Sequence, residues 1–485
     1  MSTQVSGSSV TIMGLGLFGG GVSCARWFAA RGARVTVTDL RDAQQLAPSI
    51  EALAGLDIRY VLGRHDENDF HSADIVVANP AVPPSNPLLE VARQSGAQIT
   101  SEMALALRST RARIALITGT QGKSSSATFA TQLLRASGFD AQLLGNVGRP
   151  VLDVAESLTP DSIAIVEISS YQLEALAEER SALEPMAEVV AITNIRVDHL
   201  ERHGSTESYA AAKLSILRHR KRDGWAIYDA RDSRISAQLD EGIRTIAFSD
   251  PDCASDASRQ ATLRIHMNRV WVGGECLASL AELPLAGDFQ RENVARALAI
   301  AFAFGATPAR LTNAISDLKG LPHRLEDLGT FGGRRVIDNG VSTTPDSTLA
   351  AVCALPELAA GDQVLLGGRC KAGLSFIELA CELARRRIAA VCFGADAERI
   401  ADQLRAATDA GRPPTMNAPF PIRVECVADT EAAVQYALDS GARTILFSPA
   451  AASFDAFPNF QARALHFRQV LRDHVALAPS LTAPR

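Results

Sequence analysis

The strongest constraint on the fold is a pattern that recurs along the chain: an apolar strand, a glycine-containing turn and then a helix. The segment "SVTIMGLGLFGGG" is followed by the helical "VSCARWFAARG" and then by the strand "ARVTVTD". Two further blocks open with "ARIALIT" and "RRVIDNG" and repeat the alternation. Strands that alternate with helices form parallel sheets covered by helices. Because 485 residues exceed one ordinary core, we predict three α/β domains, over residues 1–109, 110–326 and 327–485.

Composition restricts the classes of function. Hydrophobic residues make up 47% of the chain and charged residues 21%, as in soluble globular proteins. The net charge of −6 argues against a nucleic-acid or anionic-membrane partner. No apolar run approaches the ~20 residues that span a bilayer, and the first residues lack the pattern of a secretory signal. The eight cysteines show no metal-ligand spacing, so we expect reduced thiols in a cytoplasmic protein.

The segment "ITGTQGKSSS", residues 117–126, has the character of a phosphate-binding loop. Only two residues separate Gly119 from Gly122, whereas the common nucleotide loop has four. We predict a helix over residues 124–137, so the loop leads into a helix N-terminus that favours anions. Lys123 would then contact the β- and γ-phosphates, and the hydroxyl of Ser124 would serve Mg²⁺. The alternative is a glycine-rich turn with an incidental lysine.

Later segments agree with a nucleotide-dependent enzyme. Glu167 ends the apolar strand of "AIVEISSYQLE", where its carboxylate could hold Mg²⁺ opposite the phosphate loop or could simply be solvated. The segment "TNIRVDHLERHGSTESYAAAKLSIL" follows. Together with T-G-T-Q-G-K-S, these segments resemble the Mur ligases, the ATP-dependent amide-forming enzymes of peptidoglycan synthesis. Gln121 and Ser125 stand where that family usually has asparagine and threonine.

The resemblance covers nearly the whole chain and implies a three-domain fold. A Rossmann-like domain would bind UDP, a central P-loop-type domain would bind ATP, and a C-terminal Rossmann-like domain would bind an amino acid. It also implies two Mg²⁺ ions, one of them bridged by a carbamylated Lys213. A carbamate converts the cation into an anion that can hold a metal, whereas the plain alternative is a solvated lysine on a helix.

The central roles follow from the same resemblance, and one departure affects them. Phe289 and Gln290 replace the first half of the family's H-N-x-x-N, which weakens that half of the nucleotide contact. The implied catalytic residues are Lys123, His199, Lys213 and Arg324. The implied metal residues are Ser124, Glu167, His199 and Lys213. The implied nucleotide contacts are Thr120, Gln121, Gly122, Lys123, Ser124, Ser125, Ser126, Asn293, Arg324 and Asp338.

The N-terminal glycines admit two interpretations. Gly14, Gly16 and Gly19 form a G-x-G-x-x-G turn with Asp39 at the end of the next strand, a weak signal for a nicotinamide cofactor. The resemblance implies that this domain instead holds the uridine diphosphate of the substrate. The implied contacts are Leu17, Phe18, Asp39, Leu40, Arg41 and Asn79, with Asn146 of "GNVGRP" contacting the substrate or the nucleotide.

The C-terminal segment "LFSPAAASFDAFPNFQARALHF" is similar to the glutamate-adding branch of the family. That branch implies UDP-N-acetylmuramoyl-L-alanine and D-glutamate as substrates, with an acyl-phosphate intermediate. Gly340 replaces a family lysine, so Arg369 is the nearest alternative cation and L-glutamate stays open as the substrate. The implied glutamate contacts are Ser342, Lys371, Ser453 and the backbone N–H of Phe460. We expect a monomer; a nicotinamide-dependent oxidoreductase and a non-catalytic nucleotide-binding protein are the other classes.

The phosphate-loop assignment leads to a direct test. Lys123→Ala should remove an interaction that strengthens as charge develops in the transition state, and losing one such group costs ~10²–10³ in rate. Substrate-dependent release of phosphate from ATP measures the effect. Near-normal turnover in Lys123→Ala would show that the loop assignment is wrong.

Overall fold

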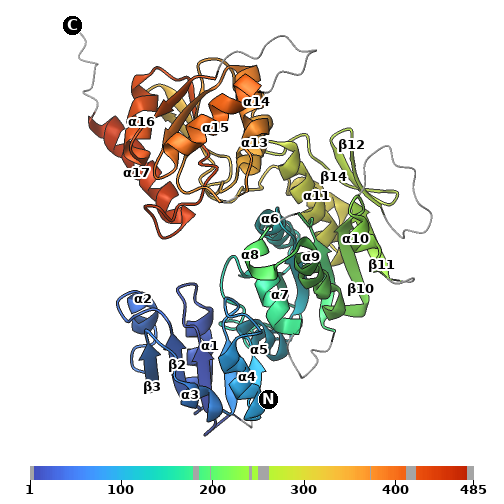
Figure 1. Cartoon of the computed structure of the whole chain (residues 1–485). Helices are drawn as coiled ribbons and strands as arrows, with labels where there is room; N and C mark the ends of the chain where they lie inside the picture. Colours follow the sequence, from blue (N-terminus) through green and yellow to red (C-terminus); the bar gives the residue numbers. More distant parts are fainter. Residues whose placement is uncertain are drawn as a thin grey trace. The chain divides into compact units, whose positions relative to one another are not determined.

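The computed structural model describes residues 5–177, 185–196, 198–239, 243–248, 262–371, 373–410 and 422–477. These residues form three separate sheets (Figure 1), which confirms the predicted α/β class. By its internal contacts the chain divides into two compact units. The first holds Met1–Pro284 and Glu292–Leu318, and the second holds Leu285–Arg291 and Lys319–Arg485. The described residues contain no helix that combines the length and apolar character needed to cross a membrane.

The first sheet is wholly parallel, with strand order β3-β2-β1-β4-β5. All five strands therefore end at one edge of the sheet, where parallel sheets bind ligands. Its strands are β1 (Ser9–Met13), β2 (Arg34–Asp39), β3 (Ile58–Leu62), β4 (Ile75–Ala78) and β5 (Gln98–Thr100). Its helices are α1 (Gly20–Ala29), α2 (Ala47–Glu51), α3 (Glu67–His71), α4 (Pro87–Gln94) and α5 (Glu102–Ser109).

The second sheet has nine strands, in the order β14-β13-β12-β11-β10-β9-β6-β8-β7. Strands β6 to β12 are parallel, and β12, β13 and β14 form an antiparallel extension. The strands are β6 (Arg113–Thr118), β7 (Ala141–Gly145), β8 (Ile163–Glu167), β9 (Ala187–Ile192), β10 (Arg220–Asp229), β11 (Arg244–Phe248), β12 (Thr262–His266), β13 (Arg269–Val272) and β14 (Glu275–Ser279). The helices are α6 (Lys123–Ala136), α7 (Ser170–Ala177), α8 (Leu200–His203), α9 (Thr206–Leu214), the 3₁₀ helix η1 (Ser215–His219), α10 (Ser233–Ser236), α11 (Asp288–Ala303) and α12 (Pro308–Asn313).

Continuous apolar runs become the central strands of this sheet. Five of the six residues of β6 and all five of β8 are buried, because helices cover both faces of a parallel sheet. Helix α6 begins one residue before the predicted start, and Gly138, with φ +87°, follows its end. Its buried side chains include Ala127, Ala130 and Leu133, the predicted apolar face.

The third sheet belongs to the second unit and has the order β15-β16-β20-β17-β18-β19. The hairpin β15–β16 is antiparallel and the other pairs are parallel. Helices α13, α14 and α15 pack on one face, and α16 and α17 on the other (Figure 1). The strands are β15 (Glu326–Phe331), β16 (Arg334–Asp338), β17 (Gln363–Gly367), β18 (Ala389–Phe393), β19 (Val424–Cys426) and β20 (Thr444–Phe447). The helices are α13 (Pro345–Ala354), α14 (Ile377–Arg386), α15 (Ala397–Ala410), α16 (Thr430–Asp439) and α17 (Phe460–Leu477).

Within the first unit, Glu102 connects the first sheet to the loop after β7. Its Oε1 accepts a hydrogen bond from the backbone N–H of Leu152 at 3.0 Å. Burial raises the pKa of Glu102 to about 7, against the opposing effect of that hydrogen bond. A folded-state pKa above the unfolded value means that ionisation of Glu102 costs stability as the pH rises from about 4.5 to about 7.

We therefore predict that Glu102→Gln flattens the dependence of stability on pH. The amide retains the acceptor for Leu152 but cannot ionise, so the loss between pH 5 and pH 8 should shrink. Thermal unfolding of the wild type and the variant at both pH values measures this. Glu90→Gln, which changes an exposed carboxyl of α4, is the control; parallel curves for all three proteins would contradict the role of Glu102.

Candidate active site

The phosphate loop is too closely packed to hold any residue but glycine at two positions. Gly119 has φ +144°, and a Cβ there would lie 1.9 Å from Oγ1 of Thr193. Gly122 has φ +81°, and a Cβ there would lie 2.4 Å from Oδ1 of Asn293. The loop ends at the first turn of α6, where backbone N–H groups and the helix dipole favour an anion.

Thr193 and Asn194, which follow β9, hold the backbone of this phosphate loop through hydrogen bonds. The N–H of Thr120 donates to the carbonyl of Asn194 at 2.8 Å, and the N–H of Gln121 donates to Oδ1 of Asn194 at 3.0 Å. In return, Oγ1 of Thr193 donates to the carbonyl of Gln121 at 2.6 Å. The "TN" of "TNIRVDHL" therefore fixes the backbone of the loop, a role that the sequence did not assign to it.

Two lysines approach the loop from different helices. Nζ of Lys123 donates to the carbonyl of Thr120 at 2.9 Å, and Nζ of Lys213 donates to the carbonyl of Gly119 at 2.7 Å. Lys213 is only 2% exposed. Burial, helped by the charge of Lys123, lowers the pKa of Lys213 to about 7, and the nearby Asp198 partly offsets this. A substantial fraction of the Lys213 amine is therefore neutral near pH 7.

Glu167 lies at the end of β8 as predicted, and it is 1% exposed. Its Oε1 accepts a hydrogen bond from Nδ2 of Asn146 at 3.1 Å. Among the described residues its Oε2 has no hydrogen-bond partner. A buried carboxylate oxygen without a partner is costly, so the arrangement fits a bound cation. Mg²⁺ prefers such oxygen ligands.

A cavity of about 260 Å³ joins four of the predicted site residues. Lys123, Asn146, His199 and Lys213 all line it. The remaining lining residues were not predicted: Ser169, Ser170, Tyr171, Asp198 and Tyr209. Tyr209 could have been inferred, because it lies four residues before Lys213 and so on the same face of a helix.

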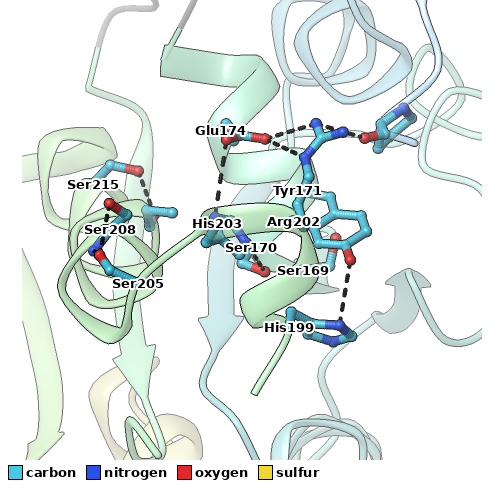
Figure 2. A network of polar contacts seen from close by, with 12 residues as sticks. Ser169, Ser170, Tyr171, Glu174, His199, Arg202, His203, Ser205, Ser208 and Ser215 are labelled. Atoms are coloured by element: carbon cyan, nitrogen blue, oxygen red, sulfur yellow. Dashed lines mark hydrogen bonds and ion pairs between the residues drawn. The ribbon is translucent and has the colours of Figure 1, made fainter. Parts of the chain in front are cut away.

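His199 has an unusual backbone conformation for a non-glycine residue. Its φ is +50°, in the left-handed region, and it is the N-cap of α8. The hydroxyl of Tyr171 lies 3.3 Å from Nδ1 of His199 (Figure 2), and Nε2 lies 3.5 Å from Oδ2 of Asp198. These contacts orient the imidazole at the cavity that Lys123 and Lys213 also line.

The serines of the loop differ in exposure. Ser124 is partly exposed, whereas Ser125 and Ser126 are buried. Of the three hydroxyls, that of Ser124 is therefore the most accessible to a metal. Asn293, 5% exposed, packs against Gly122 and supports the loop from α11.

The predicted uridine contacts lie at the carboxyl ends of β1, β2 and β4. The side chains of Leu17, Phe18 and Leu40 are exposed, by 47%, 89% and 69%. Such exposure of large apolar side chains is typical of a binding surface. The carboxylate of Asp39 instead accepts hydrogen bonds from the backbone N–H groups of Gly16 and Arg41, at 3.1 and 2.9 Å. Asp39 therefore shapes the glycine turn.

Asn79 also supports that turn. Its Nδ2 donates to the carbonyl of Gly14 at 3.2 Å, and a Cβ on Gly14 would lie 2.7 Å from Cβ of Asn79. Its Oδ1 accepts from the N–H of Ala81 at 3.0 Å. Asn79 thus joins the loop after β4 to the turn after β1.

In the second unit, strands β16, β20 and β17 are neighbours, so the loops that carry Ser342, Ser453 and Lys371 follow one edge of the sheet. Ser342 and Ser453 are buried, whereas Arg369 and Lys371 are exposed. Oγ of Ser342 lies 2.7 Å from Oγ1 of Thr348. Phe460 is the first residue of α17.

The position of the missing family lysine is filled by packing. A Cβ on Gly340 would lie 2.7 Å from Cβ of Ala464 and 3.1 Å from Cε1 of Phe447. Arg463, directly before Ala464 in the sequence, is a buried cation near this position. It donates to the carbonyls of Gly367 and Ala451 at 3.0 and 2.9 Å. Arg463 joins the last residue of β17 to the loop after β20, a role that no local pattern in the sequence indicates.

Asp338, predicted to contact ATP, belongs to a charge cluster with His323, Glu326 and Arg468. Arg324, also predicted to contact ATP, directly follows His323 in the sequence. Asp338 is 0% exposed, and its carboxylate accepts from the N–H of Gly340 and pairs with His323 and Arg468. The positions of His323, Glu326 and Asp338 could suit a metal. Arg468 already pairs with the carboxylates of Glu326 and Asp338, at 2.5 and 2.6 Å, so a protein cation already lies where a metal ion would bind.

Comparisons with known proteins agree over the length of the chain. Residues 8–101 match the family described as "Mur ligase MurD-like, N-terminal domain", and residues 117–301 match "Mur ligase middle domain". The UDP-N-acetylmuramoylalanine–D-glutamate ligase of Roseiflexus sp. (strain RS-1) is 34% identical over 96% of this chain and 99% of its own. That of Trichlorobacter lovleyi is also 34% identical, over 94% and 97%. The solved UDP-N-acetylmuramate-alanine ligase of Thermotoga maritima is 17% identical with a TM-score of 0.60, covering 96% and 100% of the two chains, and shares the fold.

Proposed function

This chain belongs to the Mur ligase family of ATP-dependent ligases, and we propose that it joins D-glutamate to UDP-N-acetylmuramoyl-L-alanine. The observation that carries the proposal is the cavity that Lys123, His199 and Lys213 line beside the phosphate loop. The names of the 34%-identical relatives support the choice of both substrates. We further propose that the enzyme acts as a monomer in the cytoplasm.

The residues of the first unit fit ATP and Mg²⁺. The N–H groups at the start of α6 and the ammonium of Lys123 would hold the phosphates. The hydroxyl of Ser124 and the unpartnered Oε2 of Glu167 would hold a magnesium ion. When bound, Mg²⁺ neutralises the charge on the transferring phosphoryl group.

Lys213 would hold a second metal as a carbamate. The ammonium first loses one proton; the neutral amine then attacks CO₂, forming an N–C bond and releasing a second proton, so that a cation becomes an anion. The lowered pKa of Lys213 supports this step, because a protonated amine has no free electron pair. His199, which lines the same cavity, would lie beside that metal.

The reaction would proceed in two steps, phosphoryl transfer and amide formation. The terminal carboxylate of the nucleotide-linked substrate attacks the γ-phosphorus of ATP, and ADP leaves. The amine of glutamate then attacks the acyl carbon; the amide forms, phosphate leaves and the amine loses a proton. Lys123 would stabilise the negative charge that develops on the phosphoryl oxygens in the first step.

The two other substrates would bind to the other sheets. The exposed Leu17, Phe18 and Leu40 would cover the uracil, whereas Asp39 and Asn79 would hold the turn that receives the phosphates. In the second unit, Lys371 would pair with a glutamate carboxylate. Ser342, Ser453 and the N–H of Phe460 would donate hydrogen bonds to it.

We predict that Lys213→Ala folds normally but is nearly inactive, and that short carboxylates such as formate partly restore turnover by replacing the missing anion. In wild-type protein supplied with ¹³C-bicarbonate, NMR should show a carbamate carbon that is absent from the variant. Lys221→Ala removes a partly exposed lysine that pairs with Glu188 and should retain full activity. Full activity in Lys213→Ala, or the same carbamate signal in both proteins, would refute the role.

We also predict that Lys371→Ala raises the KM for glutamate about 10-fold or more, because a hydrogen bond to a charged group contributes roughly 1.5–3 kcal/mol. The KM for ATP should change little. Arg385→Ala, which removes an exposed cation of α14 from the same unit, is the matched control. Steady-state assays with both enantiomers complete the test: faster turnover with L-glutamate would overturn the stereochemical assignment and leave the ligase class intact.

A further inference from the structure

Arg202 gathers three consecutive backbone carbonyls that lie about 120 positions earlier in the chain. Arg202 lies in the short helix α8, between strands β9 and β10 of the second sheet. Its Nη1 donates to the carbonyl of Ala81 at 3.0 Å, and its Nη2 donates to the carbonyls of Pro80 and Val82 at 3.3 and 3.0 Å. These three residues follow β4 of the first sheet, so a single guanidinium binds the whole turn.

The same guanidinium is fixed from the other side. Its Nε and Nη2 donate to Oε2 of Glu174 on α7 at 2.9 and 2.7 Å, and its Cζ lies 5.0 Å from the centre of the Tyr171 ring (Figure 2). The Arg202 side chain is only 10% exposed. The planar fork of an arginine can serve an acid and several carbonyls at once, whereas the compact ammonium of a lysine cannot.

Each end of this connection leads to a part of the proposed active site. Asn79, directly before Pro80, binds the carbonyl of Gly14 and so holds the glycine turn of the first sheet. At the other end, His199 is the N-cap of the helix that carries Arg202. The hydroxyl of Tyr171, whose ring Arg202 covers, contacts Nδ1 of that histidine. The chain of contacts therefore runs from the turn at Gly14 to the imidazole of His199.

We infer that Arg202 is a positioning residue for the ligation reaction. It holds the loop 80–82 against α8. It thereby fixes the distance between His199 and the glycine turn at Gly14, which would receive the nucleotide-linked substrate. Without the guanidinium, both the loop 80–82 and α8 lose the group that joins them. The inference deepens the proposed function and rests on it for its kinetic consequences.

Two other arginines provide matched controls. Arg31, which follows α1, pairs with Glu156 in the segment between β7 and β8, and so also joins the regions of the first and second sheets. Its guanidinium also contacts Trp27, and among the described residues it forms no hydrogen bond or ion pair with the loop 80–82 or with α8. Arg93 donates to the carbonyl of Pro84 at 3.0 Å, and so holds the segment that follows residues 80–82 from α4. Removing Arg31 tests whether any lost contact between the first sheet and the loop after β7 has the same effect. Removing Arg93 tests whether a general loss of order in the segment after β4 has the same effect.

The kinetic experiment compares Arg202→Gln and Arg202→Lys with Arg31→Gln and Arg93→Gln. A small misplacement of reacting groups costs about 10- to 100-fold in rate, so both Arg202 variants should lose that much kcat and require more Mg²⁺ for half-maximal activity. Their KM for ATP should stay within about two-fold of the wild-type value, because the phosphate loop is held by other residues. The two control variants should keep the wild-type kcat and Mg²⁺ requirement. Wild-type kinetics in either Arg202 variant, or an equal loss in the controls, would overturn the inference.

Hydrogen exchange gives a readout that does not depend on the reaction. In Arg202→Gln, the backbone amides of residues 79–86 and 199–204 should both exchange faster than in the wild type, because local opening of each segment becomes easier. In Arg31→Gln they should exchange at the wild-type rate. Unchanged exchange in Arg202→Gln would refute the connection. A wild-type protein that forms no amide would refute the proposed function, while faster exchange of both segments would still establish the connection itself.

Discussion

The hydrogen bond from the buried Nζ of Lys213 to the carbonyl of Gly119 sets the position of the phosphate loop, on which the rest of the proposed active site depends. The loop that begins at Gly119 packs against Thr193 and Asn293 with no space for a side chain. Moving the loop would leave a buried N–H donor without its acceptor, which is costly. The contact therefore fixes the N-terminus of α6, where an anion is favoured. It also brings Lys213 close enough to Lys123 for the second charge to help lower the pKa of the first.

The buried carboxylates at strand ends are of two kinds: some accept hydrogen bonds or form ion pairs through both oxygens, and one has an oxygen without a partner among the described residues. Asp39 accepts two backbone N–H groups, and Asp338 pairs with His323, Arg468 and the N–H of Gly340. Such acids shape the turns that follow their strands. Glu167 keeps one buried oxygen without a partner among the described residues. Because buried polar groups are normally hydrogen-bonded, this difference makes Glu167 the better candidate for a metal ligand.

Buried and partly buried arginines join elements that are far apart in the sequence. Arg202 joins the loop after β4 to α7, Arg463 joins the last residue of β17 to the loop after β20, and Arg468 pairs α17 with β15 and β16. A guanidinium can do this because it offers five donors in a fixed plane and keeps its charge when buried. Burial lowers the pKa of Arg463 to about 10, which still leaves it charged at neutral pH.

The local sequence pattern predicted the three α/β sheets, the helix after the phosphate loop and the position of Glu167 at a strand end, because periodicity and turn residues are local properties. It also named Lys123, Asn146, His199 and Lys213, which line one cavity. Packing between distant segments decided that Asp39 binds backbone N–H groups and that Gly340 has no room for a side chain. It also decided that Arg202 and Arg463 bind distant carbonyls. Burial, hydrogen-bond saturation and pKa depend on residues far apart in the chain, and no local pattern records which of them will meet.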